Sequence, residues 1–191
     1  MKPENRKIIV AITGASGSIY ARLLLSGLAK LKNPPVEIAV VFSETAREVW
    51  EFETGSKYSP EPPAKEYKND SFHAPFASGS SQYDTMIICP SSMGTIGRIA
   101  NGTSDNLIIR AADVILKERR KLIIVPRETP YNYIHLKNME TLTLAGAIIC
   151  PASPSFYSKP ATINELAMTV VNRILDLAGF DNEGYKWMEN D

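Results

Sequence analysis

Cysteine and histidine are scarce in this chain, with two of each among 191 residues. Cys89 and Cys150 each end an apolar run directly before a proline, as buried thiols at strand ends do. His73 and His135 have no companion at ligand spacing, so these four residues make no zinc site. We therefore expect no metal site and a reducing compartment, the cytoplasm.

An excess of charge is also lacking, since Lys and Arg balance Asp and Glu at 21 each. A balanced surface argues against nucleic acid or an anionic membrane as a partner, so any affinity for phosphate must be local. No segment approaches the roughly 20 apolar residues of a membrane span, and the N-terminal run has no cleavage signal. We expect neither a membrane nor nucleic acid among the partners.

Apolar residues make up 44% of the chain, which at this length suits one domain over residues 1–191 with a sizeable core. A β-branched run at residues 8–12 stops at small residues and continues into an apolar helical pattern at 19–32, which predicts a strand, a tight loop and a helix. In that loop Gly14 and Gly17 permit positive φ and close approach, while Ser16 and Ser18 offer hydroxyls to an anion. The Gly-x-x-Gly spacing is neither the dinucleotide nor the Walker pattern, so an ordinary strand-to-helix turn is the alternative.

Further apolar segments alternate between the strand and helix patterns. We expect strands at 36–42, 85–89, 122–125 and 147–150, and helices at 46–53, 96–101, 106–120, 132–144 and 163–177. Ser104 or Asp105 is the expected cap of the 106–120 helix. The prolines and scattered charges of residues 56–82 predict one long irregular loop. The β-α-β order predicts a parallel sheet with helices on both faces, a three-layer flavodoxin-like or Rossmann-like α/β fold.

Polar side chains gather where the predicted strands end, and this is where open parallel sheets bind ligands. The strand ends supply Ser16, Ser43, Ser92, Arg127, Glu128 and Tyr157, and the adjoining helices supply Arg110, Lys117 and Arg173. Two prolines flank Arg127 and Glu128, which favours positioned rather than solvated charges. The excess of cations predicts a phosphorylated ligand.

Three of these cations have structural alternatives. Arg110 and Lys117 are seven residues apart and share a helix face, so they either converge on one anion or form a solvated basic face. Arg173 falls on the apolar stripe of Leu166 and Val170, so its guanidinium needs a buried anion or must reach solvent at the edge of the core.

Several segments in chain order resemble the UbiX-type flavin prenyltransferases. They are Gly14-Ala15-Ser16-Gly17, Ser78-Gly79-Ser80, Pro90-Ser91-Ser92-Met93-Gly94-Thr95, Ser104-Asp105-Asn106-Leu107-Ile108-Ile109-Arg110-Ala111-Ala112-Asp113-Val114, Leu116-Lys117-Glu118-Arg119-Arg120, Arg127-Glu128-Thr129-Pro130, Phe156-Tyr157 and Arg173-Ile174-Leu175-Asp176. The chain departs from the family at Ser91, where cysteine is usual, and over residues 56–76.

The resemblance implies an enzyme that joins a dimethylallyl group from dimethylallyl monophosphate to N5 and C6 of reduced FMN, without a metal. It implies a homo-oligomer, typically a dodecamer with sites between subunits, and a UbiD-type decarboxylase that receives the prenylated FMN. The implied FMN-binding residues are Gly14, Ala15, Ser16, Ser43, Ser92, Met93, Gly94, Thr95 and Arg110. Lys117, Arg127, Tyr157 and Arg173 would bind the substrate phosphate, and Ser16, Glu53 and Glu128 would assist proton transfer.

Two other functions remain open from the sequence. A related flavoprotein oxidises and decarboxylates a cysteine-containing substrate with a catalytic histidine, but His73 lies in the poorly matching stretch. A non-catalytic FMN-binding subunit of a decarboxylase is the other alternative, and it would not require the second phosphate site formed by residues such as Lys117 and Arg173.

Overall fold

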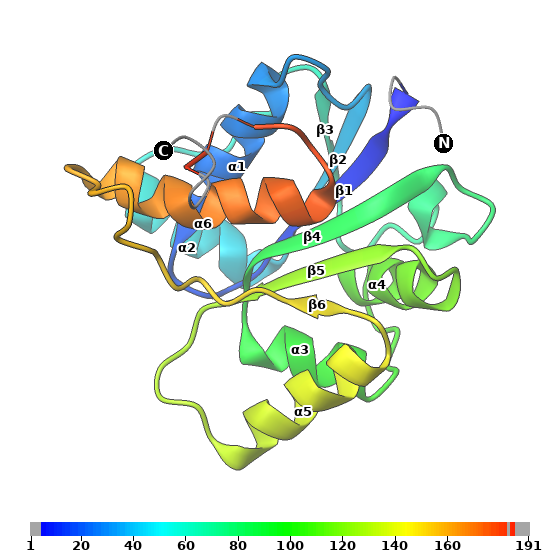
Figure 1. Cartoon of the computed structure of the whole chain (residues 1–191). Coiled ribbons are helices and arrows are strands. Elements are labelled where there is room, and N and C mark those ends of the chain that lie inside the picture. The colour runs from blue at the N-terminus through cyan, green and yellow to red at the C-terminus, as the bar shows by residue number, and fades with distance from the viewer. Residues whose placement is uncertain (1–4, 183, 186–191) are drawn as a thin grey trace.

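A six-stranded parallel sheet lies between two layers of helices in the computed structural model, which describes residues 5–182, 184 and 185 (Figure 1). The strands are β1 (Lys7–Ile12), β2 (Glu37–Phe42), β3 (Ala64–Tyr67), β4 (Tyr83–Ser91), β5 (Lys121–Pro126) and β6 (Ile148–Ile149). The helices are α1 (Ser18–Lys30), α2 (Glu44–Thr54), α3 (Met93–Ala100), α4 (Leu107–Lys117), α5 (Tyr133–Leu144) and α6 (Ile163–Ala178), with a 3-10 turn η2 (Pro75–Ala77). The strand order is β3-β2-β1-β4-β5-β6 with every neighbouring pair parallel, so the predicted three-layer, flavodoxin-like α/β fold is confirmed.

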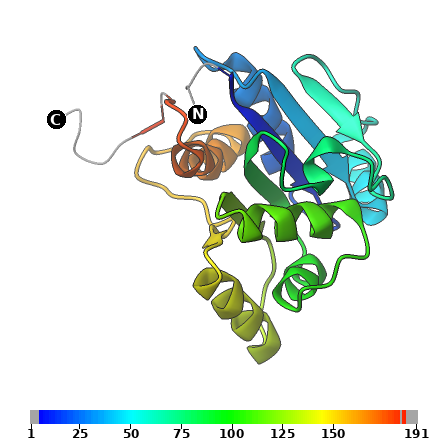
Figure 2. The same ribbon diagram turned by 90° about the vertical axis from the view of Figure 1, so that its right-hand side faces the viewer.

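Alternate side chains of each central strand enter two separate cores, as the two-residue period of a strand requires. On β1, Ile8 and Val10 pack with α1, α2 and α6, whereas Ile9 and Ala11 pack with α3, α4 and α5. Figure 1 shows these two groups of helices on opposite sides of the sheet, and the rotated view of Figure 2 keeps them apart. Burial on both faces explains why the central strands are continuous apolar runs.

Three helices begin at polar caps directly after or near the carboxyl ends of strands. The side chains of Ser43, Ser92 and Asn106 cap α2, α3 and α4, each accepting a hydrogen bond from the backbone N–H three residues ahead. The sequence prediction of Ser104 or Asp105 for α4 is wrong, because the Asn106 amide oxygen takes this N–H. Asn caps helices as well as Ser or Asp does, so local sequence does not separate the three positions.

The predicted irregular stretch of residues 56–82 contains both β3 and η2, so that prediction is wrong in part. Strand β3 extends the sheet edge by pairing with β2, with Ala64 opposite Ile38. Its sequence contains the exposed Lys65 and the half-buried Glu66, so it has no apolar run that would have revealed it. The stretch is tied to α4 at Asn69, whose backbone oxygen and side-chain Oδ1 accept the N–H groups of Leu107 and Ile108 at 2.7 and 3.1 Å.

Helix α6 buries a different stripe from the one that its sequence predicted. Its buried residues are Ala167, Val170, Val171, Ile174, Leu175 and Ala178. Leu166 is only half-buried at the margin, and Arg173 is exposed. The placement of Arg173 on the apolar stripe is therefore wrong, and its guanidinium requires no buried partner.

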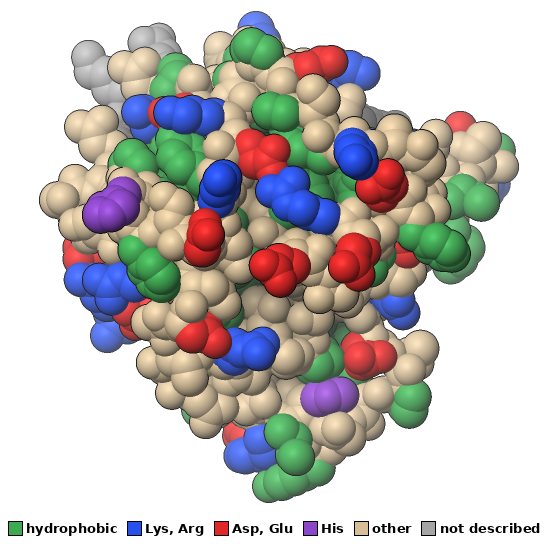
Figure 3. Space-filling view, turned by 180° about the vertical axis from the view of Figure 1, so that it is seen from behind, with side chains coloured by type: hydrophobic (Ala, Val, Ile, Leu, Met, Phe, Trp, Pro, Cys, Tyr) green, Lys and Arg blue, Asp and Glu red, His purple; other side chains and the backbone are tan. Residues whose placement is uncertain are grey.

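The surface carries charges of both signs. Figure 3 shows acidic and basic side chains interspersed over the face opposite to the view of Figure 1, in keeping with the balanced composition. Within the described ranges, no helix combines the length and the apolar character that crossing a bilayer requires.

Candidate active site

A cavity of about 180 Å³ lies at the point where the sheet order reverses, outside the carboxyl ends of β1 and β4. From β1 the chain builds outward through β2 to β3, and it then returns to the other side of β1 with β4. Ligands of open α/β sheets bind at such a point. The cavity is lined by Gly14, Ser43, Thr45, Asn69, Ser92, Thr95, Arg98, Asn106, Ile108 and Ile109.

Thr13 fixes the loops after β1 and β4 against each other. Its hydroxyl donates to the Pro90 carbonyl at 3.1 Å and accepts from the Ser92 N–H at 2.7 Å. The Thr13 N–H donates to the same carbonyl at 3.2 Å. With only 2% of Thr13 exposed, these bonds are sheltered from water and hold the two small-residue loops side by side.

The N-termini of three helices meet at this cavity. The caps of α2, α3 and α4, which are Ser43, Ser92 and Asn106, all line it. Each helix N-terminus carries the equivalent of about half a positive charge. Arg98 is the only charged residue among the described residues that line the cavity. Hydroxyl groups, helix dipoles and one cation together form a site for an anion such as a phosphate.

The two glycines of the first loop have different functions. Gly17 precedes α1 with a φ of 112°, which a residue with a side chain rarely adopts. Gly14 instead allows close approach, because a Cβ there would lie 2.7 Å from Thr45 Cγ2 and 2.8 Å from Thr45 Cβ. The loop after β1 is therefore packed tightly against the first turn of α2.

A carboxylate of the protein occupies the N-terminus of α1. Glu53, near the end of α2, accepts hydrogen bonds from Ser18 N at 2.7 Å and from Gly17 N at 3.0 Å. Partial burial raises the pKa of Glu53, but hydrogen bonds from Ser16, Ser18 and Gly17 outweigh burial and hold this pKa below its usual value. The predicted proton-transfer residues Ser16 and Glu53 are thus adjacent, and the carboxylate is ionised at neutral pH.

Arg127, directly after β5, contacts the loop that follows β1. Arg127 Nε donates to the Ser16 carbonyl at 2.9 Å, and the Arg127 N–H donates to the Ser91 carbonyl at 3.3 Å. Glu128 is exposed and accepts from the N–H of Thr129 at 2.9 Å. The structure thus brings the predicted residues Ser16, Glu53 and Arg127 together, with Glu128 next along the chain.

A second and larger groove, of about 920 Å³, lies between residues 150–160 and α6. Tyr157 and Arg173 both line it, so these two predicted phosphate-binding residues share one groove. Cys150 lies at its wall; burial raises the pKa of this thiol, and the positive charge of Arg173 opposes the effect. The groove and the first cavity have no lining residue in common.

Arg110 and Lys117 are engaged separately in the single chain. Arg110 Nε donates to the Ala77 carbonyl at 3.1 Å and Nη1 pairs with Asp113 at 3.2 Å, while Lys117 pairs with Glu118 at 3.5 Å. Helix α4 begins at the cavity and ends beside the start of β5, so Lys117 lies at the opposite end of the helix. Neither residue is among those lining the cavity.

Sequence reasoning missed four polar residues that line the cavity, namely Thr45, Asn69, Arg98 and Asn106. Asn106 carried a signal, because it stands before an apolar helical run where a cap is expected. Asn69 carried none, since it lies in the stretch predicted to be irregular.

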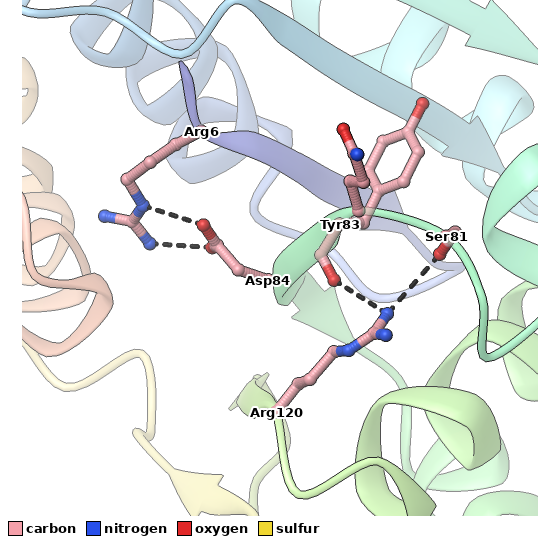
Figure 4. A pocket seen from close by; sticks show the side chains of 6 residues that line it. Arg6, Ser81, Tyr83, Asp84 and Arg120 are labelled. Atoms are coloured by element: carbon pink, nitrogen blue, oxygen red, sulfur yellow. Dashed lines mark hydrogen bonds and ion pairs between the residues drawn. The ribbon is translucent and has the colours of Figure 1, made fainter. Parts of the chain in front are cut away.

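Another groove, of about 400 Å³, lies at the amino ends of β1, β4 and β5, opposite to the cavity (Figure 4). Its cations already bind acceptors of the protein: Arg6 pairs with Asp84 at 2.9 Å, and Arg120 donates to the Tyr83 carbonyl at 3.0 Å. This groove is therefore a set of structural contacts. In the described part of the chain, no group of three or more His, Cys, Asp or Glu residues is placed to hold a metal ion.

The family model described as Flavoprotein matches residues 1–177, which together with the fold and the anion site defines the class of protein: a flavoprotein with a flavodoxin-like fold. The chain is 46% identical over 182 residues to the flavin prenyltransferase UbiX of Methanocaldococcus jannaschii, which covers 94% of this chain and 97% of the relative. The chain belongs to the UbiX-type flavin prenyltransferases, so it is an enzyme of the transferase class.

Solved structures support the same assignment. AnUbiX in complex with FMN and dimethylallyl pyrophosphate has a TM-score of 0.89 and 39% identity, covering 98% of this chain and 100% of that one. A dodecameric FMN-dependent UbiX-like decarboxylase from Escherichia coli has a TM-score of 0.87 and 37% identity, covering 95% of this chain and 99% of that one. The family resemblance found in the sequence is confirmed.

Proposed function

We propose that this chain transfers a dimethylallyl group from dimethylallyl monophosphate to N5 and C6 of reduced FMN, without a metal. Membership of the prenyltransferase family and the anion site formed by three helix N-termini carry the proposal. Reduced FMN supplies the nucleophilic nitrogen and carbon. The close approach at Gly14 and the hydroxyls of Ser43 and Ser92 suit the phosphate end of such a molecule.

The FMN site under this proposal consists of residues from the loops after β1, β2 and β4. They are Gly14, Ala15, Ser16, Ser43, Ser92, Met93, Gly94 and Thr95. The family resemblance adds Arg110, but the contacts of this side chain with Ala77 and Asp113 point to a supporting position beside the site. A cavity of about 180 Å³ is smaller than the usual 300 Å³ or more of a ligand pocket, so it suits one end of FMN.

The substrate phosphate is assigned to Arg127, Tyr157 and Arg173, with Lys117 supplied by a neighbouring copy. Cations there stabilise the phosphate as it leaves the allylic carbon. Glu128 is assigned the proton removal that accompanies the second carbon bond, and Ser16 with Glu53 assists proton movement beside the loop. The contact between Arg127 and Ser16 supports this arrangement, since it joins the two sets of residues.

We also propose a domain organisation, an oligomeric state and a partner enzyme for this chain. Residues 1–191 form one domain built on the single sheet, and copies assemble into a homo-oligomer, a dodecamer by analogy with the neighbour from Escherichia coli. The product passes to a UbiD-type decarboxylase in the cytoplasm. Two unpaired, buried cysteines are in keeping with a reducing compartment.

Anaerobic incubation with reduced FMN and dimethylallyl monophosphate, followed by mass spectrometry of the released flavin, tests the proposal. We expect a flavin heavier by one dimethylallyl unit, with or without EDTA. Dimethylallyl pyrophosphate, tried in parallel, identifies the preferred donor. Unmodified FMN with both donors, from protein that binds FMN, would favour the non-catalytic alternative.

A further inference from the structure

Arg98 extends from the last turn of α3 back over the first. Its Nη1 lies 3.7 Å from the position that a Cβ on Gly94 would occupy. Long side chains on helices lean toward the N-terminus, so this direction is the normal one for an arginine. The result places a guanidinium at the positive end of α3, beside the hydroxyl groups that line the cavity.

The helix dipole does not favour a cation at this position. Cations stabilise helix C-termini and are unfavourable at N-termini, where α3 and its neighbours α2 and α4 already contribute partial positive charges. An anion between the guanidinium and these N-termini would make both interactions favourable. The geometry is therefore that of a binding site rather than of a helix-stabilising contact.

The ion pair that Arg98 forms within the chain is exposed to solvent. Asp105 Oδ2 lies 3.4 Å from Arg98 Nε, and both side chains are 55% exposed. Exposed ion pairs of this kind contribute little. Nε makes the contact with Asp105, and Nη1 lies over Gly94.

Other cations near the site are bound more firmly by the protein itself. Arg127 donates to the Ser16 carbonyl, and Arg110 donates to the Ala77 carbonyl and pairs with Asp113. On the basis of the proposed FMN site, we propose that Arg98 binds the phosphate of FMN and so distinguishes FMN from riboflavin.

A comparison of two ligands isolates this role. Kd values for FMN and riboflavin are measured by flavin fluorescence quenching with the wild type, Arg98→Ala, Arg98→Lys and the control Lys30→Ala, which removes an exposed cation from the far end of α1. We expect Arg98→Ala to bind FMN about tenfold more weakly, with riboflavin within twofold of the wild type. Arg98→Lys should recover part of the loss, because it keeps the charge without the planar fork.

Salt provides a second readout that needs no riboflavin binding. The FMN affinity of the wild type should fall more steeply with ionic strength than that of Arg98→Ala, because one charge contact is lost in the variant. Equal FMN affinities and equal salt dependence in wild type and Arg98→Ala would overturn the inference while leaving the proposed function intact. A wild-type protein that does not bind FMN would overturn both, and circular dichroism of each variant checks that it is folded.

Discussion

The tight packing of Gly14 against α2 makes Gly14→Ala a sharp test of the cavity. The new methyl group would lie 2.7 and 2.8 Å from Thr45 Cγ2 and Cβ. Non-bonded carbon atoms prefer a distance of about 3.5 to 4.0 Å, so the new methyl group and Thr45 must move apart by roughly 1 Å. Thr45 Cβ is fixed to the helix backbone, so rotation of the side chain cannot relieve the contact. The loop after β1 or the first turn of α2 has to move.

That movement has an estimable cost. Overpacking by one methyl group typically destabilises a protein by about 1–3 kcal/mol. The displaced turn carries Ser43 and Thr45, which both line the cavity, so we expect FMN affinity to fall by about tenfold or more in addition. One factor of ten corresponds to about 1.4 kcal/mol of binding free energy.

Urea unfolding and FMN titration of a short series of variants test whether the contact with Thr45 causes these losses. Thr45→Ala should not rescue Gly14→Ala, because Cβ remains, whereas Thr45→Gly removes both close atoms and should restore FMN binding. Gly27→Ala is the matched control, since its nearest neighbour would be an ordinary 3.6 Å away. Wild-type stability and affinity in Gly14→Ala, or equal rescue by Thr45→Ala and Thr45→Gly, would refute the reasoning.

Three further predictions concern charged residues of the site. Glu128→Gln should bind FMN within twofold of the wild type yet form product about 100-fold or more slowly, the usual effect of losing a general base, and a normal rate by quenched-flow mass spectrometry would remove Glu128 from the mechanism. Arg173→Ala should raise the KM for dimethylallyl monophosphate about tenfold or more without changing the Kd for FMN; an unchanged KM in steady-state assays would exclude it from the phosphate site. Because the pKa of Glu53 is lowered by folding, its stabilisation is complete above its ordinary pKa of about 4.3 and is lost as the pH falls through the lower, folded value. In urea unfolding, Glu53→Gln should therefore have a free energy of unfolding about 0.5 kcal/mol below that of the wild type at pH 7, a small value because the carboxylate is largely exposed. This difference should narrow toward pH 3, and a difference independent of pH would contradict the reasoning.

Local chemistry made much of the fold predictable. The loop at residues 13–18 is governed by groups only a few positions apart, and it lies between a strand and a helix as predicted. The gathering of polar strand ends was also predictable, because parallel strands place their carboxyl ends on the same side of the sheet. The predicted pairing of Tyr157 with Arg173 in one groove followed only from the family resemblance.

The missed features depend on contacts between distant segments. Asn69 reaches the cavity because β3 pairs with β2 and carries the following loop to the start of α4, 38 positions further on at Leu107. The position of Arg98 in the sequence predicts an ordinary exposed side chain on α3. Only the structure shows that this side chain extends over Gly94 toward the cavity. The error at Arg173 has the same origin, since packing against the distant helix α1 decides which face of α6 is buried.

The single chain leaves the proposed site incomplete, and its surface indicates what completes it. Under the proposed function, the cavity would hold one end of FMN and Lys117 would bind the substrate phosphate. Because Lys117 is at the far end of α4, this site would need a Lys117 from another copy. Helix α5 packs Met139 and Leu142 inward but leaves Tyr133 73% and Leu144 82% exposed. Large apolar side chains that are exposed together commonly mark a protein–protein contact. Under the proposed assembly, neighbouring copies would cover this face of α5 and bring Lys117 to one another's sites, so that oligomer formation and substrate binding depend on the same contacts.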